Sequence, residues 1–323
     1  MSPFISQISL IRYLIVWRVN SSLVLLPRCP ATDFSRRLGT IVADRLPTAM
    51  ARPWRKALAA WDGPAEGPGG VAPKPPPRVP WIPQTDWPIE AVLLVYPGKR
   101  TYGQGEAIVW ELKLLGASAD HSLFLEFILP AMEDAVLISD AQTSSAKQVW
   151  GHFDIQAVYV ARGLRWEPLV KDGRLDIGCR PDATQWAEGL TFGEGVDRPF
   201  RRIRWITPFD LEGQRIPRLQ TILNALIARM TIFLPGKRPS PDDVWALIEP
   251  AEREVLQLAL QSACPRVKPP PPPSAAPKEW PGRWIGVQAF EIIPPQLIPY
   301  LELASILHVG KQTHFGCGTF SLE

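Results

Sequence analysis

The stretch LIRYLIVWRVNSSLVLLPRCPATDFSRRLGTIVADRL, residues 10–46, sets the pattern of the first half of the chain. Residues 10–19 are rich in strand-forming side chains with arginines on one edge, which predicts a buried strand. In residues 33–46 apolar side chains recur at helical spacing, with Arg36 and Arg37 on the opposite side. This segment therefore predicts a helix, which Pro47 ends.

The segments that follow continue the alternation of strand and helix. After a proline-rich stretch at 63–88, which reads as a loop, the sequence predicts strands at 89–96 and 107–115, a helix at 122–136 and a strand at 152–161. A turn-type connection, PGKRTYGQGE, joins the two middle strands. The resulting order, β-α-β-β-α-β, is that of a ferredoxin-like domain.

The second half of the chain repeats this order more loosely. It predicts a strand at 200–206, a helix at 218–234, a helical insertion at 240–262, a proline-rich spacer at 265–282, a strand at 284–293, a helix at 295–307 and a last strand at 319–322. Ser240 followed by Pro241 is a helix start. We therefore expect an α+β fold of two tandem ferredoxin-like domains, 1–195 and 196–323.

Composition narrows the class of protein. The 323 residues are 46% hydrophobic and 21% charged, so the chain is not wholly disordered, and it is long enough for two domains. The net charge of +3 means that any basic surface must be local. The four cysteines, Cys29, Cys179, Cys264 and Cys317, lie far apart, which favours reduced thiols in a cytoplasmic protein over a zinc site or a disulfide framework. Residues 8–26 contain arginines, so we expect no export or membrane segment.

The segment richest in chemistry is HVGKQTHFGCG, residues 308–318. Glycines let a backbone approach a phosphate and expose amide protons to it, and Lys311 adds a positive charge. Gly310, Gly316, Gly318 and Lys311 are therefore candidates for binding an anionic backbone. The GxxxxGK[ST] pattern of a nucleotide-binding loop is absent. A glycine-rich turn into the last strand is the alternative reading.

Residues 307–322, LHVGKQTHFGCGTFSL, resemble the C-terminal glycine-rich loop of the RAMP superfamily, and specifically of the CRISPR-associated endoribonucleases that cut precursor guide RNA. Three other segments agree with the family's pattern: PATDFSRRLGTIVADRL at 30–46, TYGQGEAIVWELKLLGASA at 101–119 and RPFRRIRWITPFDLEGQ at 198–214. The resemblance touches most of the chain, and only the last loop is specific by itself.

The resemblance implies an activity. The 2′-hydroxyl next to the scissile bond attacks phosphorus without a metal or another cofactor, leaving a 2′,3′-cyclic phosphate and a 5′-hydroxyl. The RNA would be the stem-loop of a CRISPR repeat, and the enzyme would stay bound to its product and join other effector-complex subunits in the cytoplasm, with no membrane partner. The acidic insertion at 240–262 suits contact with a partner protein.

The first predicted helix lacks the histidine that many relatives carry there. Three readings remain open: catalysis by His308 or His314, catalysis by arginines that orient and stabilise without titrating, or a protein that binds its RNA and cuts slowly or not at all. We favour the loop histidines, supported by Arg36, Arg37 and Lys311, because histidine titrates near neutral pH. His308 ends an apolar helix and could instead be a satisfied buried residue, whereas His314 lies in mid-loop and is expected to face a ligand. His121 and His152 read as structural or surface residues.

A second candidate RNA contact lies at the predicted strand 200–206. In a strand Arg202 and Arg204 share one face, and Arg201 adds charge beside them, which suits an RNA backbone. A solvated strand edge is the alternative. For the whole chain, two other hypotheses remain open: a non-catalytic RNA-binding subunit of an effector complex, and an unrelated tandem ferredoxin-like protein.

Overall fold

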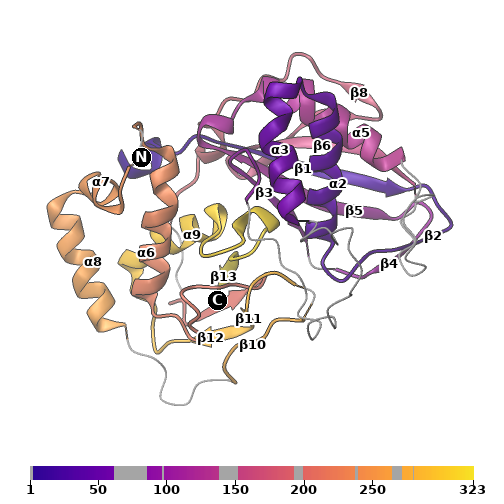
Figure 1. Ribbon diagram of the computed structural model, residues 1–323. Helices are drawn as coiled ribbons and strands as arrows, with labels where there is room; N and C mark the ends of the chain where they lie inside the picture. Colours follow the sequence, from indigo (N-terminus) through magenta and orange to yellow (C-terminus); the bar gives the residue numbers. More distant parts are fainter. Residues whose placement is uncertain are drawn as a thin grey trace, which may run out of the picture.

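An antiparallel sheet of six strands organises the first half of the chain (Figure 1). The computed structural model describes residues 3–61, 86–96, 98–137, 152–192, 199–236, 239–263, 271–278 and 280–323. The sheet order is β3-β5-β1-β6-β7-β8. The bounds are β1 Leu10–Val19, β3 Ala91–Val95, β5 Ala107–Leu115, β6 Phe153–Arg162, β7 Arg165–Lys171 and β8 Arg174–Leu175. The four predicted strands of the first domain are confirmed, and β7 and β8 extend their sheet.

Helices cover one face of this sheet. They are α2 Pro30–Arg45, α3 Thr48–Trp61 and a continuous helical stretch made of α4 His121–Leu123, the π-helical η2 Phe124–Ile128 and α5 Leu129–Leu137. In Figure 1, α2 and α3 stand side by side in front of the strands. Helix α3 was not among the predicted helices, and it contains Pro53, which has no amide proton to donate within the helix. Burial of Trp54 and Trp61 on its inner face outweighs the loss of one backbone hydrogen bond.

The small elements at the edges complete this half. A four-residue helix, α1 Pro3–Ser6, opens the chain, and β2 Leu23–Leu25 pairs with β4 Thr101–Gly103. Between β5 and α4 lies a single 3-10 turn, η1 Gly116–Ser118. The proline-rich stretch 63–88 lies outside the described residues except for 86–88, so its predicted loop character stays a prediction.

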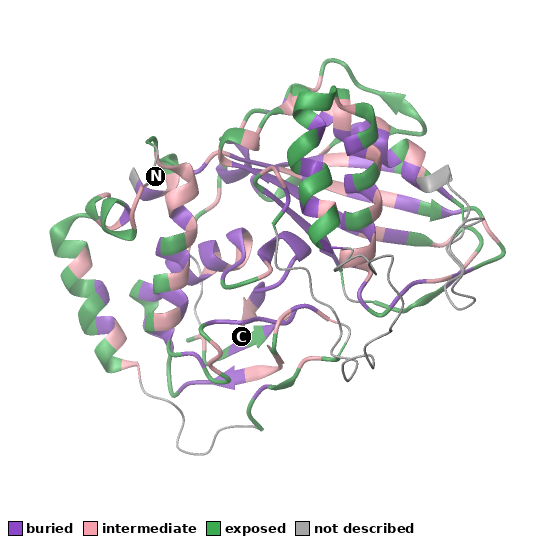
Figure 2. Cartoon of the chain, viewed as in Figure 1, coloured by how far each residue is buried: buried purple, intermediate pink, exposed green. Residues whose placement is uncertain are grey.

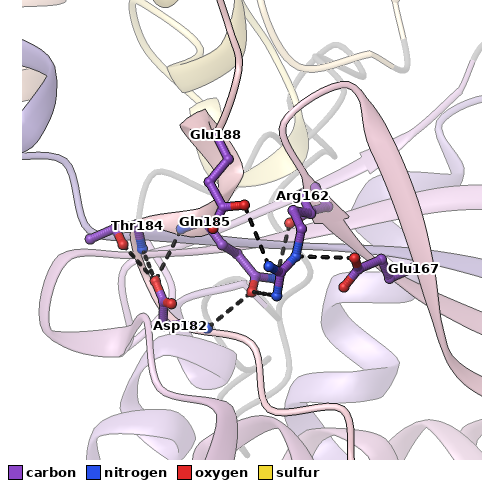
Figure 3. Close-up of polar contacts among 7 residues, drawn as sticks. Arg162, Glu167, Asp182, Thr184, Gln185 and Glu188 are labelled. Carbon is purple, nitrogen blue, oxygen red and sulfur yellow. Dashed lines mark hydrogen bonds and ion pairs between the residues drawn. The ribbon is translucent and has the colours of Figure 1, made fainter. Parts of the chain in front are cut away.

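A polar network around Arg162 lies where β6 ends and connects this strand to residues 182–188 (Figure 3). Arg162 lies 3.0 Å from Glu167 and 3.4 Å from Glu188, and its guanidinium also donates to Gln185 at 3.3 Å. Asp182 accepts from the backbone amides of Thr184 and Gln185 at 2.7 and 3.0 Å. These bonds fix the turn η3 Gln185–Ala187 against the end of β6.

The second half is built on a smaller antiparallel sheet, β12-β9-β13. Its strands and helices, in chain order, are β9 Arg202–Trp205, α6 Leu219–Met230, η4 Thr231–Phe233, α7 Pro241–Ala246, α8 Pro250–Ser262, β10 Ser274–Ala275, β11 Trp284–Ile285, β12 Val287–Ala289, η5 Pro295–Leu297, α9 Ile298–Leu307, η6 Thr313–Phe315 and β13 Phe320–Leu322. The predicted order of strands and helices is confirmed. Ser240 and Asp243 form the reciprocal capping box of α7.

The strand predicted at 284–293 is shorter and divided. It breaks at Gly286, where φ is +142°, and the ladder to β9 ends at Ala289. β11 pairs with β10 in a separate two-stranded sheet, whereas β12 pairs with β9 in the three-stranded sheet. The proline-rich spacer 265–282 is described at 271–278 and 280–282, and the remainder, like Cys264, lies outside the described residues.

Two hydrophobic cores result (Figure 2). The first lies between the six-stranded sheet and its helices, and the second between the small sheet, α6 and α9. Trp186 and the N-terminal Phe4 pack into the second core although they precede it in sequence. The predicted boundary at 195/196 falls in 193–198, outside the described residues, and stays a prediction. Among the described residues no helix is long and apolar enough to span a membrane.

Candidate functional site

The glycine-rich loop 308–318 is packed between the two halves of the molecule. All three of its glycines have positive φ: 95° at Gly310, 77° at Gly316 and 81° at Gly318. A Cβ at Gly318 would stand 1.9 Å from the carbonyl oxygen of Val309, and one at Gly316 would stand 3.0 Å from that of Leu93 in β3. The glycines are therefore required where the loop folds onto itself and onto β3.

The amides of this loop are used inside the protein. The amide of Lys311 donates to the carbonyl of Asp210 at 3.0 Å, that of Gly316 to Thr313 at 2.8 Å, and that of Gly318 to Pro208 at 2.9 Å. The expectation that these amides face a phosphate is corrected here, because each already has an acceptor within the chain. Gly310 and the Lys311 side chain are exposed, so they are the part of the loop that can meet an anion.

His308 lies inside the protein, with 0% of its surface exposed. Its Nδ1 lies 3.1 Å from the carbonyl oxygen of Gly316 and 3.2 Å from that of Cys317. Its Nε2 lies 2.9 Å from Lys113 Nζ. Carbonyl oxygens only accept, so the neutral ring carries its proton on Nδ1 and accepts from lysine at Nε2. Burial and the adjacent Lys113 hold the pKa of His308 well below its ordinary value. Direct contact with a substrate is therefore ruled out in this arrangement, and the alternative of a satisfied buried histidine describes it.

Lys113 belongs to a buried polar strip on the face of β5 that meets the second half of the chain. Its ammonium donates to the carbonyl of Ile306 at 2.7 Å, and burial lowers its pKa to about 8. Two residues earlier, Glu111 accepts from Arg12 Nε at 2.6 Å and from the Tyr96 hydroxyl at 2.9 Å. The strip fixes the first sheet against the end of α9, and with it the glycine-rich loop.

His314 was expected to face a ligand, but only 4% of its side chain is exposed. Its ring stacks on Trp61, at 6.3 Å between centroids and 18° between planes, and lies 3.9 Å from the ring of Phe315. Tertiary packing of α3 against η6 therefore covers it. Its Nδ1 stands 2.7 Å from a carboxylate oxygen of Asp86, which is 81% exposed. Among the described residues neither ring nitrogen has a hydrogen bond of regular geometry, so the contact with Asp86 is one of charge and proximity.

Helix α2, which bears the predicted arginines, packs near this histidine. Helix α2 contacts η6, and Phe34 of α2 shares a hydrophobic core with Phe315. Arg36 is exposed and Arg37 is half-buried. The α2–α3 hairpin runs antiparallel, with Gly39 opposite Trp54 and Leu58, which sets the first turn of α2 level with Trp61. The structure thus brings α2, α3 and the glycine-rich loop together.

Asp33, in the first turn of α2, is a residue that the sequence analysis missed. Burial raises its pKa to about 6, against the opposing effect of Arg36 and Arg37. It stands three and four residues before the two arginines, which places all three on one side of the helix. That spacing was the available signal. The alternation of charged and apolar residues in a buried strand could have indicated Lys113 as a buried polar residue. Nothing in the sequence indicated Asp86 as a partner of His314.

The arginines at β9 stand apart from this cluster. Arg202 and Arg204 share the exposed face of β9 as predicted, and Arg201 is exposed beside them. The guanidinium of Arg204 pairs with the carboxylate of Glu323, at 3.2 Å between Nη2 and Oε2. The described contacts do not join these arginines to the loop, so their RNA-binding role stays a prediction.

The remaining histidines and the described thiols lie outside the glycine-rich loop or form no metal site. His121 Nδ1 lies 3.0 Å from the Tyr13 hydroxyl, and His152 is exposed. Cys29, Cys179 and Cys317 are free thiols. Within the described ranges, no group of three or more histidine, cysteine, aspartate and glutamate side chains is placed to hold a metal ion.

Comparison with known proteins gives matches among solved structures only. No protein-family model matches the chain, and no curated protein matches it. The structure titled "Cas6 (TTHB231) product complex" is 17% identical with a TM-score of 0.45, over 98% of this chain and 100% of that one. The Thermus thermophilus Cas6 (TTHB231) is 14% identical with a TM-score of 0.44, over 98% and 99%. A "Partial Cas6-RT-Cas1--Cas2 complex" is 9% identical with a TM-score of 0.49, over 97% of this chain and 46% of that one.

Proposed function

We propose that this chain is a metal-independent endoribonuclease that binds the stem-loop of a CRISPR repeat, cleaves precursor CRISPR RNA and stays bound to the product. One observation carries the proposal. The segment 307–322 resembles the glycine-rich loop of such enzymes, its His314 lies 2.7 Å from the carboxylate of Asp86, and its turn η6 contacts helix α2.

The reaction is an internal transfer at phosphorus. The ribose 2′-oxygen forms a bond to the phosphorus as the bond from phosphorus to the 5′-oxygen breaks. The 2′-hydroxyl proton passes to a base, and an acid supplies a proton to the leaving 5′-oxygen. A 2′,3′-cyclic phosphate and a 5′-hydroxyl result. Positioning, proton transfer and charge stabilisation are the three tasks of the protein.

The residues divide these tasks by their chemistry. The Asp86 carboxylate lies 2.7 Å from Nδ1 of His314 and would orient the ring so that Nε2 serves proton transfer. Asp33 is a second proton acceptor, since its pKa of about 6 lets it exchange protons near neutral pH. Arg36, Arg37 and Lys311 supply positive charge for the phosphorane-like transition state. His308 is a positioning residue, because its ring ties the loop to β5.

The burial of both loop histidines supports a second candidate function. His308 has no exposed surface and His314 almost none, so neither reaches a substrate without a shift of the loop. A subunit that grips RNA through Lys311, Arg36 and Arg37 without cutting it would need no such shift. This alternative is a non-catalytic RNA-binding subunit of a CRISPR effector complex.

Partner contact is a further part of the proposal. Helix α8 exposes Val255 and Leu258 beside its acidic residues. Exposed apolar side chains on an otherwise charged helix suit a protein neighbour better than an RNA groove. Other subunits of an effector complex are therefore the proposed partners of residues 240–262, alongside the repeat RNA.

One experiment separates the two functions. A 5′-labelled repeat hairpin is incubated with the protein in EDTA, beside a hairpin carrying a 2′-deoxy residue at the cut. Cleavage of the first alone, with a cyclic phosphate on the labelled fragment, supports the nuclease. Binding of both without cleavage supports the subunit. Equal cleavage of both hairpins contradicts 2′-hydroxyl attack.

The residues are tested by matched pairs. His314→Ala and Asp86→Asn should each slow cleavage about 10²-fold or more, the usual contribution of a proton-transfer group. His152→Ala, at an exposed histidine outside the site, is the control and should leave the rate unchanged. Equal rates for His314→Ala and His152→Ala would remove the histidine from the mechanism.

A further inference from the structure

We propose that the exposed face of α3, through Arg52, Arg55 and Lys56, binds the phosphate backbone of an RNA duplex and holds the repeat stem beside the glycine-rich loop. The inference deepens the proposed function and rests on it for the kind of nucleic acid. It assigns a surface for the stem, separate from the cluster that would perform the cleavage.

The three basic side chains share one side of the helix. Arg52, Arg55 and Lys56 stand three and four residues apart, which is the spacing of neighbours on a helix surface. All three are exposed, whereas Ala51, Trp54, Ala57 and Trp61 form the buried inner face. Figure 2 shows α3 at the front of the molecule with its outer side exposed. A straight row of cations is thus presented outward by a rigid element.

The charge of this hairpin exceeds that of the whole protein. Residues 30–61 contain six basic and two acidic residues, a formal charge of +4, whereas the whole chain carries +3. Both acidic residues lie on α2, and α3 has none. On α3 itself three cations stand without any acidic residue, which favours a polyanion over an ordinary protein neighbour.

The same face lacks the groups that read single strands. Proteins bind unpaired RNA by stacking bases on exposed aromatic rings. Both tryptophans of α3 point inward, and the side chains between the cations, such as Pro53 and Ala59, are small. Such a surface can approach phosphates closely but offers nothing to unstacked bases. It therefore suits a duplex, recognised by its backbone and not by its sequence.

The position of the face links it to the loop. The last residue of α3, Trp61, packs on His314 and Phe315, at 6.3 and 5.6 Å between ring centroids. At a rise of about 1.5 Å per residue, Lys56 stands roughly 8 Å along the axis from Trp61. A stem lying on α3 would thus deliver its base close to His314 of the glycine-rich loop.

The test measures salt dependence with the full chain and a non-cleavable hairpin that carries 2′-deoxy at the cut. The variant Arg52→Gln/Arg55→Gln/Lys56→Gln removes three charges and keeps helix-forming side chains. The slope of its plot of log affinity against log salt concentration should be smaller in magnitude by about 2.7, which is near 0.9 for each of three lost phosphate contacts. If the curves meet at 1 M salt, affinity at 0.1 M falls about 500-fold. Exchanging stem base pairs should leave the wild-type affinity unchanged.

A second variant controls for charge alone. Arg165→Gln/Lys171→Gln/Arg174→Gln removes three exposed charges from β7 and β8. An unchanged slope there, with the shallower slope of the α3 variant, supports the proposal. Equal slopes in the two variants overturn it, as does an equal loss of single-stranded RNA binding by the α3 variant. If the wild type binds the hairpin but never cuts an all-ribose copy, the proposed nuclease activity is wrong, whereas the proposed RNA-binding surface on α3 is unaffected. If the α3 variant cleaves normally and its salt slope equals that of the wild type, the proposed surface is wrong, whereas the nuclease activity is supported.

Discussion

Replacing Glu111 by glutamine tests how the buried strip on β5 holds the two halves of the chain together. Glu111 is 1% exposed and accepts from Arg12 at 2.6 Å and from Tyr96 at 2.9 Å. It is also the charge that opposes the burial of Lys113. Glutamine keeps the shape of the side chain but removes the charge, so two cations lose their buried counter-charge.

The expected cost is large because the site is dry. Removing one partner of a buried ion pair costs about 3–5 kcal/mol, since the other charge is left uncompensated. The matched control is Glu167→Gln, the same change in an exposed pair with Arg162 at 3.0 Å. An exposed pair contributes about 0–1 kcal/mol, so this control should be nearly neutral. Both variants remove one carboxylate charge, from a buried pair in one case and in the other from an exposed pair whose arginine keeps Glu188.

Urea unfolding followed by circular dichroism gives the free energy of unfolding of each variant. The double variant Arg12→Leu/Glu111→Leu should lose less than the sum of Arg12→Leu and Glu111→Leu, because the pair is removed as a unit and only Lys113 loses a counter-charge. A loss below about 1 kcal/mol for Glu111→Gln, equal to that of Glu167→Gln, would refute the reasoning that burial sets the strength of this pair.

Three more outcomes are expected. Gly318→Ala should cost at least about 3 kcal/mol, because positive φ strains alanine by about 1–2 kcal/mol and its Cβ would overlap Val309, whereas Gly189→Ala, with open space around it, should cost only the strain; thermal unfolding measures both. The pKa of Asp33 is raised to about 6 in the folded protein, so the folded state binds this proton more tightly than the unfolded chain does. The free energy of unfolding should therefore fall as pH rises from about 4 to 6. The variant Asp33→Asn should abolish that fall and should also remove the limb near pH 6 from the pH–rate profile of cleavage. The pKa of Lys113 is lowered to about 8, so the unfolded chain binds its proton more tightly and stability should rise between about pH 8 and 10.5; a Lys113→Met variant showing the same rise in pH-dependent urea unfolding would contradict this.

Local periodicity was enough for most of the fold. The strand at 107–115 and that at 10–19 match their predicted bounds, and the start of α7 at Ser240 follows from its cap. Helix α3 was not predicted. It forms although Pro53 is a local signal against a helix, because the packing of Trp54 outweighs that signal. The strand after Trp284 was overestimated because alternation continues past the point where pairing with β9 ends.

The candidate site was predictable in composition but not in exposure. The sequence pointed to the glycine-rich loop and to Arg36 and Arg37, and the structure places the loop against α2 and α3. It gave no warning that the amides of Lys311 and Gly318 would be used by Asp210 and Pro208, a hundred residues away in the chain. Nor did it show Asp86 as the partner of His314.

By itself the sequence determined most of the strands and helices, though not α3, because side-chain period and capping act between close neighbours along the chain. Only the tertiary structure decided that His308 is buried against Lys113, that His314 is covered by Trp61 and that Arg52, Arg55 and Lys56 face outward. Burial depends on which distant segments pack against a residue. The sequence of the residue's own segment does not contain that information.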